Sequence, residues 1–176
     1  MGTLHAVTSI LTYPGVIFRL VLTQLFCRIF RCKVKKVKYI SIERPCAVVE
    51  HEDLTGTPKR FWLCFLPFFF SFIIGLAILL PSALQLFHLG NATFLNAVLF
   101  WVGFSLICNM FPEYQDARAM WSGIYKNKKT PMIAKILLAP VNAVMFSGSW
   151  LTYMGLHMAV GVLAAVILPF LLLLFL

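Results

Sequence analysis

Arg19 is the only charged residue well inside the first long apolar stretch, at about 4–30. A charge near the centre of a bilayer costs at least about 2.5–3.5 kcal/mol, so an ionisable residue in a membrane span often marks a functional site. The alternative is that the long side chain of Arg19 reaches the lipid headgroups, which a helix starting as late as Pro14 would allow. The sequence leaves both interpretations open.

The thiol and imidazole side chains show no arrangement typical of a reactive or metal site. Cys27 and Cys32 have a spacing that could begin a zinc knuckle, but no second Cys or His pair follows, so we expect free thiols. The four histidines are far apart, and none has a ligand partner at helical spacing. No nucleophile elbow or Ser-x-x-Lys motif indicates a serine hydrolase.

Composition indicates that membrane helices carry these residues. The 176-residue chain is 61% hydrophobic and 12% charged, with a mean hydropathy of +0.89, which exceeds what a soluble fold can bury. A helix of about 20 apolar residues crosses a bilayer. The sequence predicts one integral membrane domain with five spans, at about 4–30, 61–87, 92–111, 131–150 and 153–176.

Two basic connections separate these spans. In the region 31–59, polar residues alternate with β-branched or aromatic ones, which predicts a β hairpin. The segment 112–130 predicts a basic interfacial stretch with a short helix. The fold class we expect is therefore an all-α membrane protein with a short cytoplasmic-side β hairpin between the first and second spans. The residues that could pair with another strand are Val34, Val37, Tyr39, Val48, Val49 and His51.

The charge distribution predicts the orientation of the chain. Of the 15 Lys and Arg residues, all but Arg19 lie in the two basic connections or near their edges. Both connections share one side of the membrane, and the positive-inside rule makes that side cytoplasmic. The N-terminus is then outside and the C-terminus is cytoplasmic. Topology and anionic headgroups account for the net charge of +9, so we expect no nucleic-acid partner.

Several segments resemble, in order, the small site-2-protease-like membrane metalloproteases. The segments that carry the resemblance are Tyr13–Phe18, Gln24–Val37, Ala47–Glu52, Leu66–Ser71 and Asn109–Ala117. In that family a helix carries His-Glu-x-x-His, in which two histidines on one helix face bind zinc and the glutamate activates a metal-bound water. The resemblance implies that residues 19–23 occupy the place of that motif.

The motif itself is lost in this chain. Arg19, Leu20 and Thr23 stand where the family has its two histidines and its glutamate, and neither leucine nor arginine offers a lone pair to a metal. The resemblance assigns the third ligand position to Asp116. It implies a degenerate former metal site with no cofactor, in which Arg19 either pairs with Asp116 or leaves Asp116 as a solvated or helix-capping acid.

The expected function follows from this loss. The chain is interpreted as a non-catalytic scaffold or binding subunit, whose partners are the lipid bilayer and another membrane protein or transmembrane segment. An edge strand of the hairpin could take up an extended segment by strand addition. Two alternatives stay open: an active metalloprotease or other hydrolase with an altered site, and a small channel, transporter or effector in which Arg19 lines an oligomeric pathway.

Overall fold

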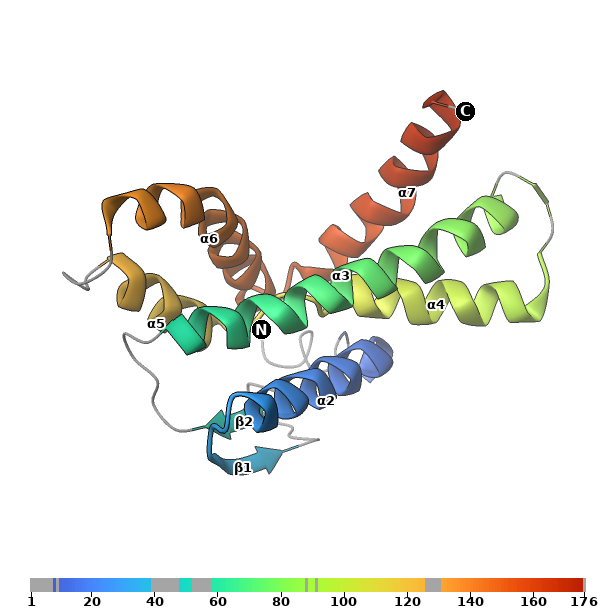
Figure 1. The fold of residues 1–176 in the computed structure, drawn as a ribbon. Helices are drawn as coiled ribbons and strands as arrows, with labels where there is room; N and C mark the ends of the chain where they lie inside the picture. The colour runs from blue at the N-terminus through green and yellow to red at the C-terminus, as the bar shows by residue number, and fades with distance from the viewer. Residues whose placement is uncertain are drawn as a thin grey trace.

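A computed structural model describes residues 8, 10–38, 48–51, 58–87, 89–90, 92–125 and 131–175. This part of the chain is dominated by helices, which confirms the prediction of an all-α fold (Figure 1). The helices and strands, in chain order, are α2 (Tyr13–Ile29), β1 (Val34–Lys38), β2 (Val48–His51), α3 (Pro58–Phe87), α4 (Phe94–Cys108), α5 (Tyr114–Tyr125), α6 (Met132–Tyr153) and α7 (His157–Phe175).

The helices follow the predicted apolar stretches. Helix α2 begins at Tyr13, and the described residues just before it, Thr8, Ile10 and Leu11, are helical as well. The backbone turns at Thr12 between them, and Pro14, which lacks an N–H, is favoured in the first turn of the helix that follows. Within the described residues, two stretches are long and apolar enough to cross a bilayer, Lys59–Phe87 and Lys135–Tyr153. The apolar parts of α4 and α7 are shorter, so the five-span arrangement remains a prediction.

Helices α3 and α4 form the centre of the fold. They pack so closely that a side chain at Gly103 would lie 2.7 Å from the backbone nitrogen of Leu79. In Figure 1, α2 and the strands lie on one side of this pair, whereas α6 and α7 rise on the other. The main apolar core lies between α3, α4 and α7 and contains Leu79, Ile107 and Ala165.

A cluster of neutral hydrogen bonds fastens the start of α2 to α4. We call Thr12, Gly15, Ser105 and Asn109 the polar clasp. The Ser105 hydroxyl donates to the Thr12 carbonyl and accepts from the Gly15 N–H, both at 2.7 Å. The Asn109 amide donates to the same Thr12 carbonyl at 3.1 Å. A Cβ at Gly15 would overlap the Ser105 carbonyl, so only glycine permits this approach.

Strands β1 and β2 pair antiparallel, with Val37 opposite Val49 and an irregularity between Val34 and Lys36. The chain between the strands, residues 39–47, lies outside the described residues, so the hairpin connection and its cytoplasmic position remain predictions. Val37 packs against Val16 and Leu20 of α2. The strand pair is thereby attached to the face of α2 that carries the candidate site.

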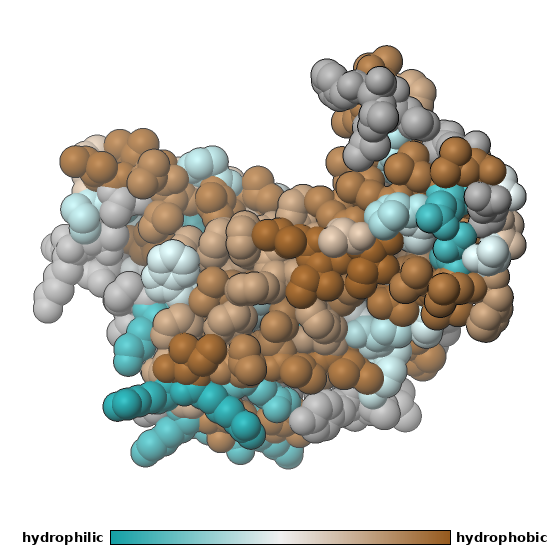
Figure 2. All heavy atoms as spheres, turned by 45° about the vertical axis from the view of Figure 1, so that its right-hand side comes forward, coloured by the Kyte–Doolittle hydropathy of each residue, from teal (hydrophilic) through white to brown (hydrophobic). Residues whose placement is uncertain are grey.

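The surface separates hydrophilic from hydrophobic residues. Figure 2 shows an exterior that is largely hydrophobic, with hydrophilic side chains gathered mainly along its lower edge on the left and in a second, smaller group on the right. The rotation between the two views is about the vertical axis, so this edge is at the height at which Figure 1 draws the strands. The exposed side chains of β1 and its approach include Lys33, Lys35 and Lys36.

Candidate functional site

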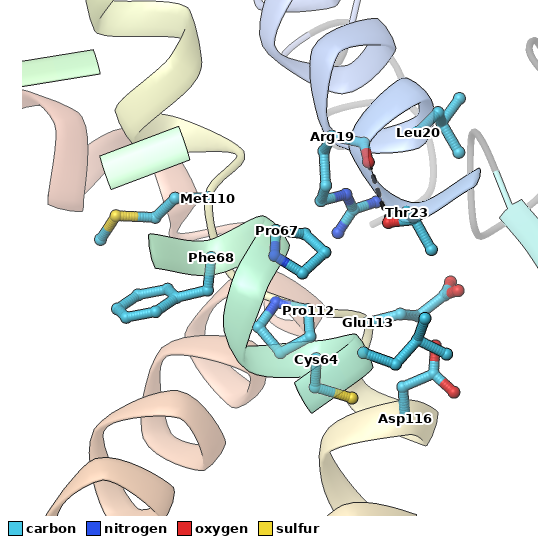
Figure 3. A pocket seen from close by; sticks show the side chains of 11 residues that line it. Arg19, Leu20, Thr23, Cys64, Pro67, Phe68, Met110, Pro112, Glu113 and Asp116 are labelled. Atoms are coloured by element: carbon cyan, nitrogen blue, oxygen red, sulfur yellow. Dashed lines mark hydrogen bonds between the residues drawn. The ribbon is translucent and has the colours of Figure 1, made fainter. Parts of the chain in front are cut away.

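A cavity of about 40 Å³ lies between α2, α3 and the turn that leads into α5 (Figure 3). It receives Arg19, Leu20 and Thr23 from α2 and Asp116 from α5. These are the four residues that the family resemblance assigned to the degenerate metal site. Helices α3 and α4 lie between α2 and α5 in the sequence, so the fold brings these residues together from distant parts of the chain. The remaining lining side chains are Leu63, Cys64, Pro67, Phe68, Met110, Pro112 and Glu113.

Arg19 turns into this cavity. Its Nη1 donates to the carbonyl oxygen of Phe111 at 2.8 Å, and the side chain is partly buried. On the same helix, the Thr23 hydroxyl donates to the Arg19 carbonyl at 2.8 Å (Figure 3). The guanidinium therefore joins α2 to the turn between α4 and α5.

Asp116 has a cationic partner that the sequence did not suggest. Its Oδ1 lies 3.2 Å from Nη2 of Arg60, and the two side chains are 29% and 10% exposed. Neither sequence interpretation of Asp116 named this partner: the cation is Arg60 of α3 and not Arg19, and the carboxylate is not simply solvated. As the third residue of α5, Asp116 also lies where a negative charge favours a helix start.

Glu113 adds a second carboxyl group to the cavity. Burial raises the pKa of Glu113 to about 7, the nearby Arg19 guanidinium lowers it, and the negative charge of Asp116 raises it. A group with such a pKa gains and loses a proton near neutral pH. The cavity is thus lined by one arginine cation, Arg19, by the Asp116 carboxylate that is paired with Arg60 outside the lining, and by the Glu113 carboxyl group, which titrates near neutral pH.

These residues do not fit the zinc ion that the family resemblance implies. Leu20 has no donor atom, Arg19 is a cation, and the Thr23 hydroxyl is engaged by its own helix. Asp116, the assigned third ligand, is paired with Arg60. Within the described residues, no three His, Cys, Asp or Glu side chains are grouped so that they could hold a metal.

The predicted strand-pairing segment lies beside the cavity. Leu20 lines the cavity and also belongs, with Val16, to the cluster against which Val37 of β1 packs, while Val34 at the start of β1 is exposed. Val48, Val49 and His51 form most of β2. Tyr39 lies outside the described residues.

Sequence reasoning missed three residues of this site. They are Arg60, which pairs with Asp116, and Glu113 and Cys64, which line the cavity. One signal pointed toward Arg60 and Glu113: each directly adjoins an apolar stretch, where the first helical turn or a proline turn can fold a charge back into the protein.

Comparison of the chain with protein families, with characterised proteins and with solved structures gave no match. The geometry of the cavity and its surroundings is therefore the basis for any functional proposal.

Proposed function

We propose that this chain is a non-catalytic, site-2-protease-like membrane protein that binds a segment of another membrane protein. It crosses the bilayer five times, with the N-terminus outside and the C-terminus in the cytoplasm. The segment that it binds is extended and acidic, and it pairs with the free edge of the two-stranded sheet next to the cavity.

The packing of Val37 against the cluster that Val16 and Leu20 form on α2 carries this proposal. It connects the strand pair directly to the cavity, so a segment paired with the sheet would lie beside Arg19 and Asp116. In a metalloprotease this position would expose the segment to a metal-activated water. Here the same position holds side chains that cannot bind the metal, and the segment is retained without being cut.

The charge of the sheet indicates the chemistry of the bound segment. Lys33, Lys35 and Lys36 are exposed along β1. An edge strand offers unpaired backbone N–H and C=O groups, which bind an extended chain of any sequence. Opposite charges across a strand pair add about 0.2–1 kcal/mol each, so acidic side chains on the bound segment are preferred.

A photo-reactive amino acid at Lys36 of the full chain, expressed in its own membrane, tests this proposal. We expect it to cross-link to an extended acidic segment of another membrane protein, which is recovered at full length. The matched control carries the same photo-reactive residue at Leu163, on the exposed face of α7. With the photo-reactive residue kept at position 36, reversing the charge with Lys33→Glu and Lys35→Glu should abolish cross-linking.

Two results contradict the proposal. Equal cross-linking from Leu163 would show that the sheet is not a specific binding site. Recovery of a cleaved partner, together with one zinc ion per purified protein by elemental analysis, would show an active protease.

A gain-of-function variant tests the family placement separately. Arg19→His, Leu20→Glu and Thr23→His together restore the motif on α2, with Asp116 nearby on α5. If the placement is right, the purified triple variant should bind one zinc ion, and adding Asp116→Ala should weaken zinc binding at least about tenfold. A triple variant that folds but binds zinc no better than the wild type contradicts the resemblance.

A further inference from the structure

The C-terminus of α2 ends in a tight turn that brings two cysteines together. The Cys32 N–H donates to the Cys27 carbonyl at 2.8 Å, and the Arg31 N–H donates to the Arg28 carbonyl at 3.1 Å. The backbone of Arg31 has the left-handed conformation, with φ of 54°. This pair of hydrogen bonds and the left-handed residue between them define a Schellman motif.

In a Schellman motif the first and last residues of the turn commonly make a side-chain contact. Here those residues are Cys27 and Cys32, and both belong to the apolar cluster around Phe26 and Leu63. With the 2.8 Å hydrogen bond between their backbones, ordinary bond lengths hold the two α-carbons within about 6.7 Å. This separation lies within the range that a disulfide bond can bridge.

The two thiols differ in their exposure to solvent. Cys27 is fully buried, whereas Cys32 is partly exposed. Three exposed cations, Arg28, Arg31 and Lys33, flank Cys32 and favour the approach of an anionic reagent. Cys64 and Cys108 are buried in other elements, so Cys32 is the most accessible of the cysteines that the structure describes.

We propose that Cys27 and Cys32 form a redox-active dithiol that is reversibly modified by anionic low-molecular-weight disulfides. The proposal is independent of the function proposed for the cavity. Cys32 is the attacking thiol, because it is accessible, and Cys27 is the resolving thiol, because it lies next to Cys32 within the turn. Closure of the disulfide links the last turn of α2 to the start of β1.

The exchange proceeds in two balanced steps. The Cys32 thiolate attacks one sulfur of the external disulfide, forms a mixed disulfide and releases one thiolate. The Cys27 thiol then loses its proton and attacks the Cys32 sulfur, which releases the second thiolate. Two protein thiols are oxidised to one disulfide, the external disulfide is reduced to two thiols, and the two protons from the cysteines balance the two thiolates.

Oxidised glutathione is the probe that tests this proposal. The purified full chain is incubated with it, free thiols are alkylated, and the unreduced protein is denatured and digested with trypsin. Cleavage after Arg28 and Arg31 falls between the two cysteines, so the disulfide is expected to link peptide Leu20–Arg28 to peptide Cys32–Lys33. A reducing agent should separate the two peptides.

Single variants identify the order of the steps. Cys27→Ser should stop at one glutathione attached to Cys32, and Cys32→Ser should take up none. Cys108→Ser is the matched control and should cross-link like the wild type. A wild-type protein left unmodified, or a Cys32 linked to the 39–59 peptide that contains Cys46, would overturn the proposal. Because the wild-type digest alone distinguishes these results, the test does not depend on how well the variants fold.

Discussion

Helix α2 is attached to the rest of the protein in two regions that use opposite chemistry. At its start, the polar clasp joins it to α4 with neutral hydrogen bonds between small residues. About one turn further on, the cavity surrounds Arg19 with the turn between α4 and α5 and with two carboxyl groups. The clasp contains no charge, whereas the cavity contains four ionisable side chains.

The difference separates a structural role from a functional one. Close approach of small residues and neutral hydrogen bonds is the usual way in which helices associate in lipid, so the clasp needs no further explanation. Charges taken out of water pay a desolvation penalty that their attraction barely offsets, and apolar residues of similar size would often be at least as stable. Stability alone therefore does not account for the charges of the cavity, whereas it does account for the neutral hydrogen bonds of the clasp.

The largest expected loss of stability comes from a variant that breaks the polar clasp. Gly15→Ala places a methyl group against the Ser105 carbonyl, which belongs to a rigid helix backbone and cannot move away. We expect a loss of about 3 kcal/mol in the free energy of unfolding, measured by denaturant titration in mixed micelles. Val21→Ala, on the exposed face of the same helix, is the control and should change it by less than about 1 kcal/mol. A tolerated alanine at Gly15 would mean that the clasp does not fix α2.

The second-largest effect is expected from a variant that breaks the ion pair between Arg60 and Asp116 and leaves the rest of the cavity unchanged. Asp116→Asn leaves the largely buried Arg60 without its carboxylate, and the partial exposure of Asp116 limits the cost to about 2 kcal/mol of unfolding free energy. Arg118→Ala, an exposed residue of the same helix, is the control. If the pair is coupled, adding Arg60→Met to Asp116→Asn should recover part of the loss. Losses that simply add would contradict the pairing.

A pH titration sharpens the comparison, because only the cavity contains a group that titrates near neutral pH. The pKa of Glu113 is raised in the folded protein to about 7, so its stabilising contribution is complete below about pH 4.5 and is lost as the pH rises through 7. The melting temperature should therefore fall between pH 5 and pH 8.

Two variants check the assignment to Glu113. Glu113→Gln should flatten this fall, and Gln115→Ala, an exposed neighbour, should leave it unchanged. Arg19→Met removes the cation that lowers the pKa of Glu113, so the fall should move to higher pH. An unchanged pH profile in Glu113→Gln would assign the titration to another group.

The smallest effect lies beyond both regions, at the end of α2. Arg31 has a left-handed backbone that glycine adopts without strain, so Arg31→Gly should raise the free energy of unfolding by about 1 kcal/mol. Lys33→Gly is the control, because Lys33 has no left-handed backbone, and it should bring no gain. A stabilised Lys33→Gly would mean that the effect arises from lost charge and not from backbone strain.

Much of the fold could be predicted from the sequence, because a long apolar stretch strongly indicates a helix of matching length. The stretches 61–87 and 131–150 correspond closely to α3 and α6. Hydropathy does not show the turn at Thr12, which separates the helical residues before it from α2, because Pro14 and the clasp define where that helix begins. The family resemblance also anticipated that Arg19, Leu20, Thr23 and Asp116 would lie around one cavity.

The partners within the cavity could not be predicted in the same way. Which cation pairs with Asp116 depends on how α3 is rotated about its axis relative to α5, and hydropathy carries no information on that angle. Arg60 is therefore found only once the helices are packed. The burial of Glu113 likewise depends on the path of a short turn after Pro112, which is set by packing against α2 and α3.

The irregular register of the two-stranded sheet affects whether two copies of the protein in one membrane can pair through their strands. Lys35 is an extra residue between the pairs Val34 with His51 and Lys36 with Glu50, so the strand bends there. Two identical edges brought together would meet with mismatched curvature and with lysine facing lysine. These features oppose polymerisation of the sheet with its own kind.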